Sequence, residues 1–406
     1  MKRIYLIIKL IFRIKIIFKE PKKYPLVVFD KDSMVDIKNV VKEFDYFVME
    51  NRIHHIENIY ISINLLRLFI KNYKNNVMTA YLVSLLELIK PKVVITFIDN
   101  SEKFSDLAKI LSNKIKFVAI QNAYRIDIIE NDYLKKISKK KADLNKYFYI
   151  PKLLCFGQHN IDLYKKFKLK VKYFEKVGSL RLANALKHIK DNKVKLKKSN
   201  YDVCVISDTA SSFTLKGLLQ NLDSTDESSG FHFDKGMAYT VKYAIKFCIK
   251  YNKKFIFILK HKSNKTKQKR ELNFYKKYLS QKEFSFLASN TTKNKVGRFN
   301  SYIKMLQSKV AVSTISTMLG ENLALGKKIL ACNLTNLELL DFPNGGICSM
   351  KHCSYEKFEK RLLYILSISE KKYCYKLSKN KNYIVTFNKK ISTIKILQGI
   401  IRKLLR

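Results

Sequence analysis

The chain has 406 residues, which is more than one compact core usually holds and suits two domains. Its 80 lysines and arginines against 33 aspartates and glutamates give a formal net charge of +47, which favours anionic partners such as acidic lipid, nucleic acid or phosphorylated substrates. An AT-rich genome also produces such a lysine-rich bias, and no RNP, zinc-finger or helix-turn-helix pattern accompanies it. We therefore expect no nucleic-acid partner.

The N-terminal stretch is apolar but interrupted by Lys9, Arg13 and Lys15, and it has no small-residue cleavage site. These features exclude a signal peptide, and the stretch is too short and too charged to span a bilayer. Two interpretations stay open: an ordinary element of the first domain, or a basic amphipathic segment lying on anionic lipid. Seven scattered cysteines without a C-x-x-C pair argue against a zinc or redox site. We expect a cytoplasmic protein, and the second interpretation would place it on the inner face of the membrane.

In the first half of the chain, short apolar runs alternate with helical patterns. Runs at residues 24–30, 92–98, 116–120, 153–156 and 173–177 predict buried strands. This alternation is typical of a parallel sheet covered by helices, in which ligands bind beyond the carboxyl ends of the strands. Those ends carry Asp99, Asn100, Gln121 and Asn122, which predicts a polar rim at one edge of the sheet.

A charged segment without apolar periodicity, at residues 188–200, predicts a linker, after which a second alternation begins. The fold class we expect is α/β, with two Rossmann-like domains and parallel sheets. The expected boundaries are residues 1–190 for the acceptor-side domain, 200–385 for the nucleotide-sugar domain, and 386–406 for an amphipathic helix able to pack back on the first. Neither half has a G-x-G-x-x-G after its first strand, so we expect no NAD, FAD or other cofactor.

The most informative stretch, residues 310–330, reads as strand, turn, helix, glycine stop and strand. Hydroxyl side chains lie where the helix begins, at Ser313, Thr314, Ser316 and Thr317. The free N–H groups and positive dipole end of a helix suit a phosphate. Glu321 lies one turn after Thr317 on the same face, in reach of a sugar hydroxyl. An ordinary capped α/β unit with a surface glutamate would also explain this pattern.

Three segments together resemble glycosyltransferases of the GT-B type: residues 260–263 (KHKS), 313–317 (STIST) and 320–327 (GENLALGK). More narrowly, they are similar to bacterial surface-carbohydrate and O-antigen biosynthesis proteins, and distantly to capsule polymerases and polysialyltransferases that carry a His-Pro pair and a Ser-Ser or Ser-Thr pair. In this sequence Lys262 replaces the proline. The resemblance covers about residues 90–335 and implies two domains that face an interdomain cleft.

The resemblance implies transfer of a sugar from a nucleotide-activated donor to a glycan or lipid-linked glycan, without a metal. It assigns the leaving phosphate to His261 and to one of the two hydroxyl pairs, and a ribose contact to Glu321. We expect His261 to be catalytic, together with a base on the acceptor side. The residues that we expect to bind the nucleotide sugar are Lys260, Ser313, Thr314, Ser316, Thr317, Gly320 and Glu321.

On the acceptor side, the chemistry requires a base if the enzyme inverts, and Asp99 at the end of a buried strand is our candidate. A helix N-cap is the alternative role for Asp99, and Asp208 is a competing base. Asn100, Gln121 and Arg125 are the expected acceptor contacts, with the Arg125 fork suited to an acidic group. The alternative functions are a polyol-phosphate transferase or nucleotide-sugar epimerase on the same fold, or a non-catalytic basic protein that binds nucleic acid.

Overall fold

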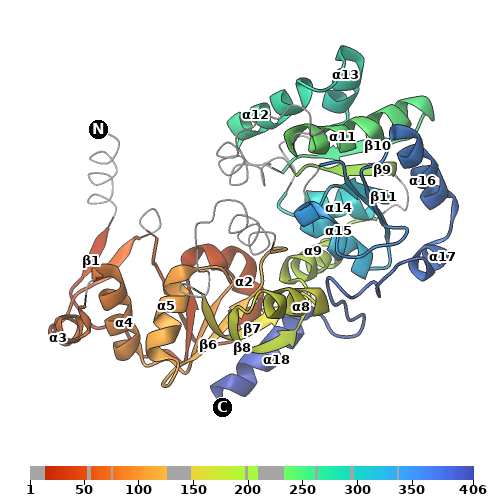
Figure 1. Ribbon diagram of the computed structural model, residues 1–406. Helices are drawn as coiled ribbons and strands as arrows, with labels where there is room; N and C mark the ends of the chain where they lie inside the picture. The colour runs from red at the N-terminus through yellow and green to blue at the C-terminus, as the bar shows by residue number, and fades with distance from the viewer. Residues whose placement is uncertain are drawn as a thin grey trace.

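The computed structural model describes residues 14–52, 56–74, 76–125, 148–196, 200–208, 233–260, 264–292, 297–335 and 338–406. Within these ranges the chain forms two α/β lobes, each built around a parallel sheet (Figure 1). The expected fold class, α/β with two Rossmann-like parallel sheets, is confirmed. The boundaries that we placed between the domains stay predictions.

The N-terminal lobe contains a six-stranded sheet of order β3-β2-β5-β6-β7-β8, in which all neighbours pair in parallel. The strands are β2 (Leu26–Phe29), β3 (Tyr46–Met49), β5 (Val93–Thr96), β6 (Lys116–Ile120), β7 (Tyr149–Cys155) and β8 (Lys170–Lys176). The helices are α2 (Met34–Val41), α3 (Ile63–Asn72), α4 (Val77–Ile89), α5 (Glu102–Leu111), α8 (Gln158–Lys166) and α9 (Leu180–Asp191), with a 3-10 turn η1 (Lys31–Ser33). Every residue of β2 and β5 is buried, since helices cover both faces of the sheet.

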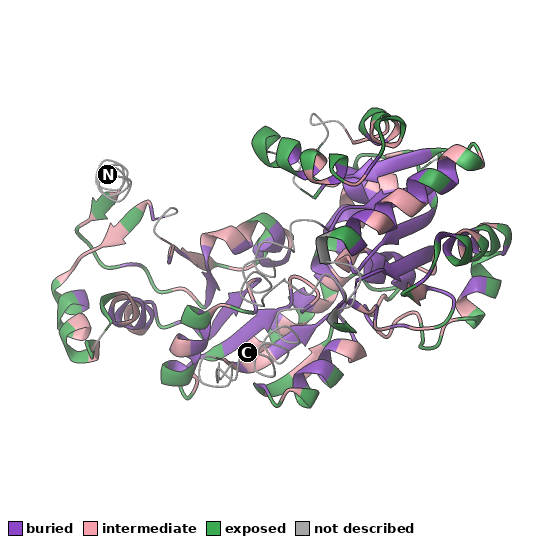
Figure 2. Cartoon of the chain, turned by 45° about the horizontal axis from the view of Figure 1, so that its top comes forward, coloured by how far each residue is buried: buried purple, intermediate pink, exposed green. Residues whose placement is uncertain are grey.

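The C-terminal lobe contains a five-stranded parallel sheet of order β10-β9-β11-β12-β13. Its strands are β9 (Tyr201–Ile206), β10 (Phe255–Ile258), β11 (Ser308–Ser313), β12 (Lys328–Asn333) and β13 (Ser349–Lys351). Its helices are α11 (Phe233–Lys250), α12 (Lys265–Lys276), α13 (Gln281–Ser289), α14 (Asn300–Leu306), α15 (Thr317–Ala324), α16 (Tyr355–Ser367) and α17 (Glu370–Tyr375), with a 3-10 turn η5 (Glu338–Leu340). Figure 2 shows the buried strands at the centre of both lobes and the exposed helix faces outside them.

The last helix, α18 (Thr393–Leu405), returns to the N-terminal lobe (Figure 1). Its residues Ile394, Leu397 and Ile401 are buried and join a core cluster with side chains of β2, β5, α2 and α9. The spacing of these three residues places them on one helical face, and that face covers the sheet. The Ser392 side chain caps the helix by accepting a hydrogen bond from the Lys395 N–H.

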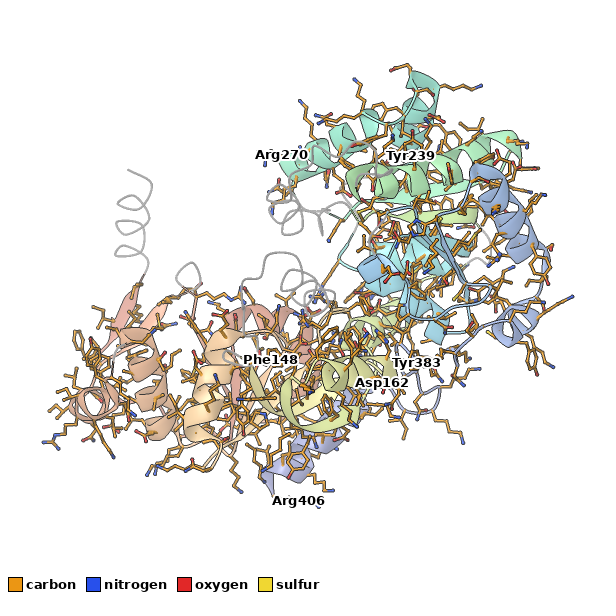
Figure 3. The ribbon with its side chains drawn as sticks, viewed as in Figure 1. Phe148, Asp162, Tyr239, Arg270, Tyr383 and Arg406 are labelled. Carbon is orange, nitrogen blue, oxygen red and sulfur yellow. The ribbon has the colours of Figure 1, made fainter. Side chains whose placement is uncertain are left out.

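The chain reaches α18 through residues 383–387, which we call the crossover segment. Its backbone pairs with the N-terminal lobe: the Thr386 N–H donates to the Phe156 carbonyl at 2.7 Å, and the His159 N–H donates to the Tyr383 carbonyl at 2.9 Å. The Tyr383 hydroxyl donates to Asp162 Oδ2 at 3.1 Å, and these two side chains lie together where the lobes meet (Figure 3). The crossover segment is therefore part of the contact between the lobes.

The N-terminal stretch is described only from residue 14, where β1 (Lys15–Ile17) pairs in parallel with β4 (Asn58–Tyr60). Whether the earlier residues form an amphipathic segment lies outside the described residues. Among the described helices, none combines the length and the hydropathy that a bilayer span requires.

Candidate functional site

The turn that leads from β11 into α15 is held by the carboxylate of Asp208. Its Oδ2 accepts hydrogen bonds from the backbone N–H groups of Thr314 and Ile315, both at 3.0 Å, and lies 2.6 Å from Ser313 Oγ. Burial raises the pKa of Asp208, and these hydrogen bonds oppose that effect. Asp208 therefore fixes the direction in which α15 begins, through its hydrogen bonds to Ser313, Thr314 and Ile315.

α15 begins against the N-terminal lobe, because Thr317 Oγ1 accepts a hydrogen bond from the Tyr124 N–H at 3.1 Å. In the part of the chain that the structure describes, no acceptor pairs with the backbone N–H groups of Thr317 and Met318. The Ser316 side chain does not cap the helix either. Open N–H groups at the positive end of a helix dipole form a site that attracts an anion.

Beside this helix end lies a hollow of about 360 Å³, which we call the interlobe hollow. The N-terminal lobe contributes Val35, Asp36, Asn122 and Arg181, and the C-terminal lobe contributes Arg298, Phe299, Tyr302, Thr317, Met318 and Glu321. Its size lies within the range of small-molecule sites, about 300–1,000 Å³. Of the predicted donor-side residues, the structure brings Thr317 and Glu321 to this hollow.

Two arginines of the hollow hold the same carboxylate, Asp36 of α2. Arg181 Nε lies 3.2 Å from Asp36 Oδ2, and the Arg298 fork donates to Asp36 Oδ1 and to the Val35 carbonyl. The Arg298 pair joins the two lobes. The arginine side chains remain 46% and 43% exposed, whereas that of Asp36 is 8% exposed. Both guanidinium groups are thus positioned by Asp36 and still accessible to an anion in the hollow.

Glu321 lies one turn after Thr317, as the spacing predicts, but its carboxylate is buried. It accepts hydrogen bonds from the hydroxyl of Ser179, which caps α9 in the other lobe, and from the Tyr302 hydroxyl at 2.9 Å. Burial raises the pKa of Glu321 to about 7, and the two hydroxyl donors oppose that rise. Glu321 is therefore not the surface residue of the alternative interpretation, and its ribose contact stays a prediction.

The raised pKa of Glu321 predicts a pH-dependent stability. A carboxyl whose pKa rises on folding from 4.5 to about 7 stabilises the fold fully below pH 4.5, and this contribution is lost as the pH rises through 7. From about pH 5.5 to about pH 8 the loss should be about 2 kcal/mol in the free energy of unfolding. Urea titrations of the wild type and of Glu321→Gln at both pH values measure it as a difference between the two proteins.

His159 supplies a trend of opposite sign that both proteins share, because burial lowers its pKa to about 4. The difference between the two proteins isolates Glu321 from this background. Parallel pH profiles for wild type and Glu321→Gln would show that the carboxyl does not titrate as the geometry indicates.

The predicted base, Asp99, lies at the end of β5 as expected but is fully enclosed. It accepts hydrogen bonds from Arg125 Nε at 2.8 Å, from the Tyr164 hydroxyl at 3.2 Å and from the Asn122 N–H at 3.2 Å. The alternative role as N-cap of α5 belongs to Ser101, whose hydroxyl accepts from the Phe104 N–H. A catalytic role for Asp99 stays a prediction, and its observed contacts are those of a buried ion pair.

Gln121 is buried, and its side-chain amide forms hydrogen bonds with three separate residues of the N-terminal lobe. Its Nε2 donates to Asn160 Oδ1 at 2.7 Å and to the Ala123 carbonyl, and its Oε1 accepts from the Phe156 N–H at 2.9 Å. Asn160 in turn donates to the Ile384 carbonyl in the crossover segment. Gln121 and the Asp99–Arg125 pair therefore hold the loop of residues 121–125 against α15.

The same loop carries Tyr124, which stacks on His159 with ring centroids 5.4 Å apart. The Tyr124 hydroxyl lies 3.1 Å from His159 Nε2, and the Tyr383 ring meets the imidazole edge-on at a centroid distance of 5.5 Å. Since its lowered pKa leaves His159 neutral at neutral pH, this group contributes no charge to the lobe contact.

The remaining predicted residues fall in several places. Ser313 and Thr314 are buried in the Asp208 turn, while Ser316 and Gly320 line a narrow pocket with Tyr124. Asn100 is exposed. Lys260, just after β10, is exposed as well, and its backbone N–H donates to the Glu271 carboxylate. His261, the predicted phosphate contact, lies outside the described residues.

Sequence reasoning assigned no role to Asp36, Arg181 or Arg298. Arg181 comes shortly after the predicted strand at residues 173–177, and this place near a strand end is the signal that could have identified it. Asp36 and Arg298 are 262 residues apart and meet only because the lobes meet. No local pattern could have identified that pair.

No protein-family model and no curated protein sequence matches the chain. Among solved structures, trehalose-6-phosphate synthase from Burkholderia multivorans has a TM-score of 0.46 at 8% identity, over 95% of this chain and 93% of that one. UDP-GlcNAc 2-epimerase from Methanocaldococcus jannaschii has a TM-score of 0.44 at 13% identity, over 93% and 98%. The wall teichoic acid polymerase TagF has a TM-score of 0.46 at 10% identity, over 94% and 88%. These likenesses concern the overall α/β fold alone.

Proposed function

We propose that the chain is a GT-B-type glycosyltransferase that binds a nucleotide-activated sugar in the interlobe hollow. The observation that carries the proposal is the meeting, in one hollow, of the open end of α15 with the half-exposed forks of Arg181 and Arg298. Open N–H groups at a helix end and arginine forks both favour a phosphate. Arg181 comes from the N-terminal lobe, and Arg298 and α15 come from the C-terminal lobe. A donor and an acceptor could then be held from opposite sides.

In a glycosyl transfer, negative charge builds up on the phosphate oxygens of the leaving nucleotide. Donors positioned in advance lower the barrier, since they need no rearrangement as this charge develops. The Thr317 and Met318 N–H groups and the two arginine forks are the donors that we assign to this task. Asp36 holds the forks in place by ion pairs.

The finer parts of the proposal rest on the sequence resemblance. They are a glycan or lipid-linked glycan acceptor, a role in surface-polysaccharide synthesis, metal independence, the phosphate contact of His261 and the base role of Asp99. Peripheral contact with an anionic membrane is a further part, supported by exposed apolar side chains on one face of α3, where Ile63 is 71%, Leu66 50% and Ile70 74% exposed. Co-flotation with phosphatidylglycerol vesicles tests that contact.

A thermal-shift panel of UDP-, GDP-, CMP- and CDP-linked sugars tests the donor site. A donor present at about 100 times its Kd stabilises the fold by about 2.7 kcal/mol, which is a shift of several degrees in Tm. We expect Arg298→Ala to raise the Kd of the active donor about tenfold or more, because a charge-assisted hydrogen bond contributes about 1.5–3 kcal/mol.

The matched control is Arg402→Ala on α18, since Arg402 is also a half-exposed arginine paired with a carboxylate, Glu43. It should leave donor binding unchanged. Absence of a shift with every donor, or an equal loss in both arginine variants, would count against the proposed function. A shift with duplex DNA that falls steeply with salt would favour the nucleic-acid alternative.

A further inference from the structure

A second and larger pocket, of about 570 Å³, lies on the N-terminal lobe between α2, α9 and the start of α18. Residues 386–390, which lead into α18, form another part of its wall. We call it the lysine pocket, because six lysines line it: Lys42, Lys187, Lys190, Lys389, Lys390 and Lys395. They come from three separate parts of the chain, so the fold itself brings these charges together.

The lysine pocket has little negative charge of its own. Among the described residues that line it, Asp191 is the one carboxylate, and Lys187 Nζ already donates to it at 2.6 Å. The hydrogen bond from Lys187, together with the charges of Lys190 and Lys42, lowers the pKa of Asp191. Across the described chain, no ion pair involves the ammonium groups of Lys42, Lys190, Lys389, Lys390 or Lys395. Like charges gathered around a pocket create a potential that attracts an anion.

A buried amide on the wall of the pocket adds a second requirement. Gln398 is 2% exposed, and its Nε2 donates to the Asn39 carbonyl at 3.2 Å. Its Oε1 has no hydrogen-bond partner among the described residues. Exchanging Oε1 and Nε2 by rotating the amide would not solve this, because Oε1 would then face the Asn39 carbonyl, and two acceptors cannot pair. A buried acceptor without a hydrogen bond is unfavourable, so the site favours a ligand that brings a hydroxyl donor.

We propose that the lysine pocket binds a phosphorylated polyol, such as a glycerol phosphate or a sugar phosphate. Its phosphate would lie among the lysines and one of its hydroxyls would donate to Gln398 Oε1. The apolar lining, from Leu182, Leu186 and Phe387, suits the carbon face of such a molecule. This chemistry has two sources, a free metabolite and the headgroup of an anionic lipid. The inference stands apart from the proposed donor site, whose hollow is lined by other residues.

Isothermal titration of the full chain with glycerol 3-phosphate tests the proposal, with inorganic phosphate and glycerol as separate probes. The pocket variant is Lys389→Glu/Lys390→Glu, and the matched control is Lys357→Glu/Lys360→Glu on the exposed face of α16. Both double variants change the net charge equally. We expect the pocket variant to raise the Kd about tenfold or more and the control to leave it within about twofold.

A third variant, Gln398→Met, keeps the side-chain volume and removes the acceptor. It should reduce the preference for glycerol 3-phosphate over inorganic phosphate, with thermal melts confirming that the fold is retained. The proposal is overturned if glycerol 3-phosphate does not bind, or if the pocket and control variants weaken binding equally, which would indicate a nonspecific effect of net charge.

Vesicle sedimentation then separates the two sources. If Lys389→Glu/Lys390→Glu loses binding to phosphatidylglycerol vesicles while the control variant keeps it, the ligand is a lipid headgroup. If vesicle binding is unchanged while glycerol 3-phosphate binding is lost, the ligand is a soluble metabolite. Either result supports the proposed pocket.

Discussion

Asp99→Ala is expected to lower the free energy of unfolding by about 3–5 kcal/mol, because it breaks the buried ion pair between Asp99 and Arg125. The side chains of Asp99 and Arg125 are 0% and 7% exposed, and Asp99 is also hydrogen-bonded to Tyr164 and to the Asn122 backbone. Urea denaturation measures the loss. The double variant Asp99→Leu/Arg125→Met should recover part of it, since it replaces both members of the buried ion pair with apolar side chains.

Asp106→Ala is the control for this experiment. Asp106 forms a surface pair with Lys109 at 3.6 Å, with side chains 48% and 36% exposed. Such pairs contribute at most about 1 kcal/mol. If Asp99→Ala proves as stable as Asp106→Ala and yet abolishes sugar transfer, the structural interpretation fails and the predicted base gains support.

Gly178→Ala is expected to lower the free energy of unfolding by about 3 kcal/mol or more. Gly178 has a φ of +83°, a conformation that costs an alanine about 1–3 kcal/mol. In addition, a Cβ atom here would overlap the Thr386 carbonyl in the crossover segment and lie 3.0 Å from Thr393 Oγ1. The substitution should therefore separate α18 from the N-terminal lobe, visible as a lower urea midpoint and as faster proteolysis after residue 386.

The matched control is Gly399→Ala. Gly399 lies inside α18, and a Cβ there would meet nothing within 4 Å. Alanine should stabilise that helix by about 0.5–1 kcal/mol. Equal midpoints for the two variants would show that the close approach of Thr386 to Gly178 does not contribute to stability.

The sequence predicts the central strands well, because a strand buried on both faces must be a continuous apolar run, as in β2, β5 and β6. It does not predict β3 or β13, at the edges of the sheets, or the small pair of β1 and β4. These strands are short and partly exposed, so their composition differs little from that of a loop.

The candidate site shows a similar division. Local spacing correctly placed Thr317 and Glu321 on one face of a helix. It could not indicate that Ser179 and Tyr302 enclose Glu321, since those partners are 142 and 19 residues away. Polar residues at strand ends, such as Asp99 and Gln121, were read as ligand contacts. Both side chains are buried and hydrogen-bond within the N-terminal lobe, Asp99 to Arg125 and Gln121 to Asn160, because buried polar groups need partners. Their roles toward a ligand stay predictions.

The return of α18 gives the two lobes two covalent connections, one between α9 and β9 and one at the crossover segment. A pair of bodies tied at one point can twist and tilt in any direction. Bodies tied at two points keep a single easy movement, which is rotation about the line through both ties. A relative rotation of the two lobes must therefore change backbone angles in both connections at once, between α9 and β9 and in the crossover segment.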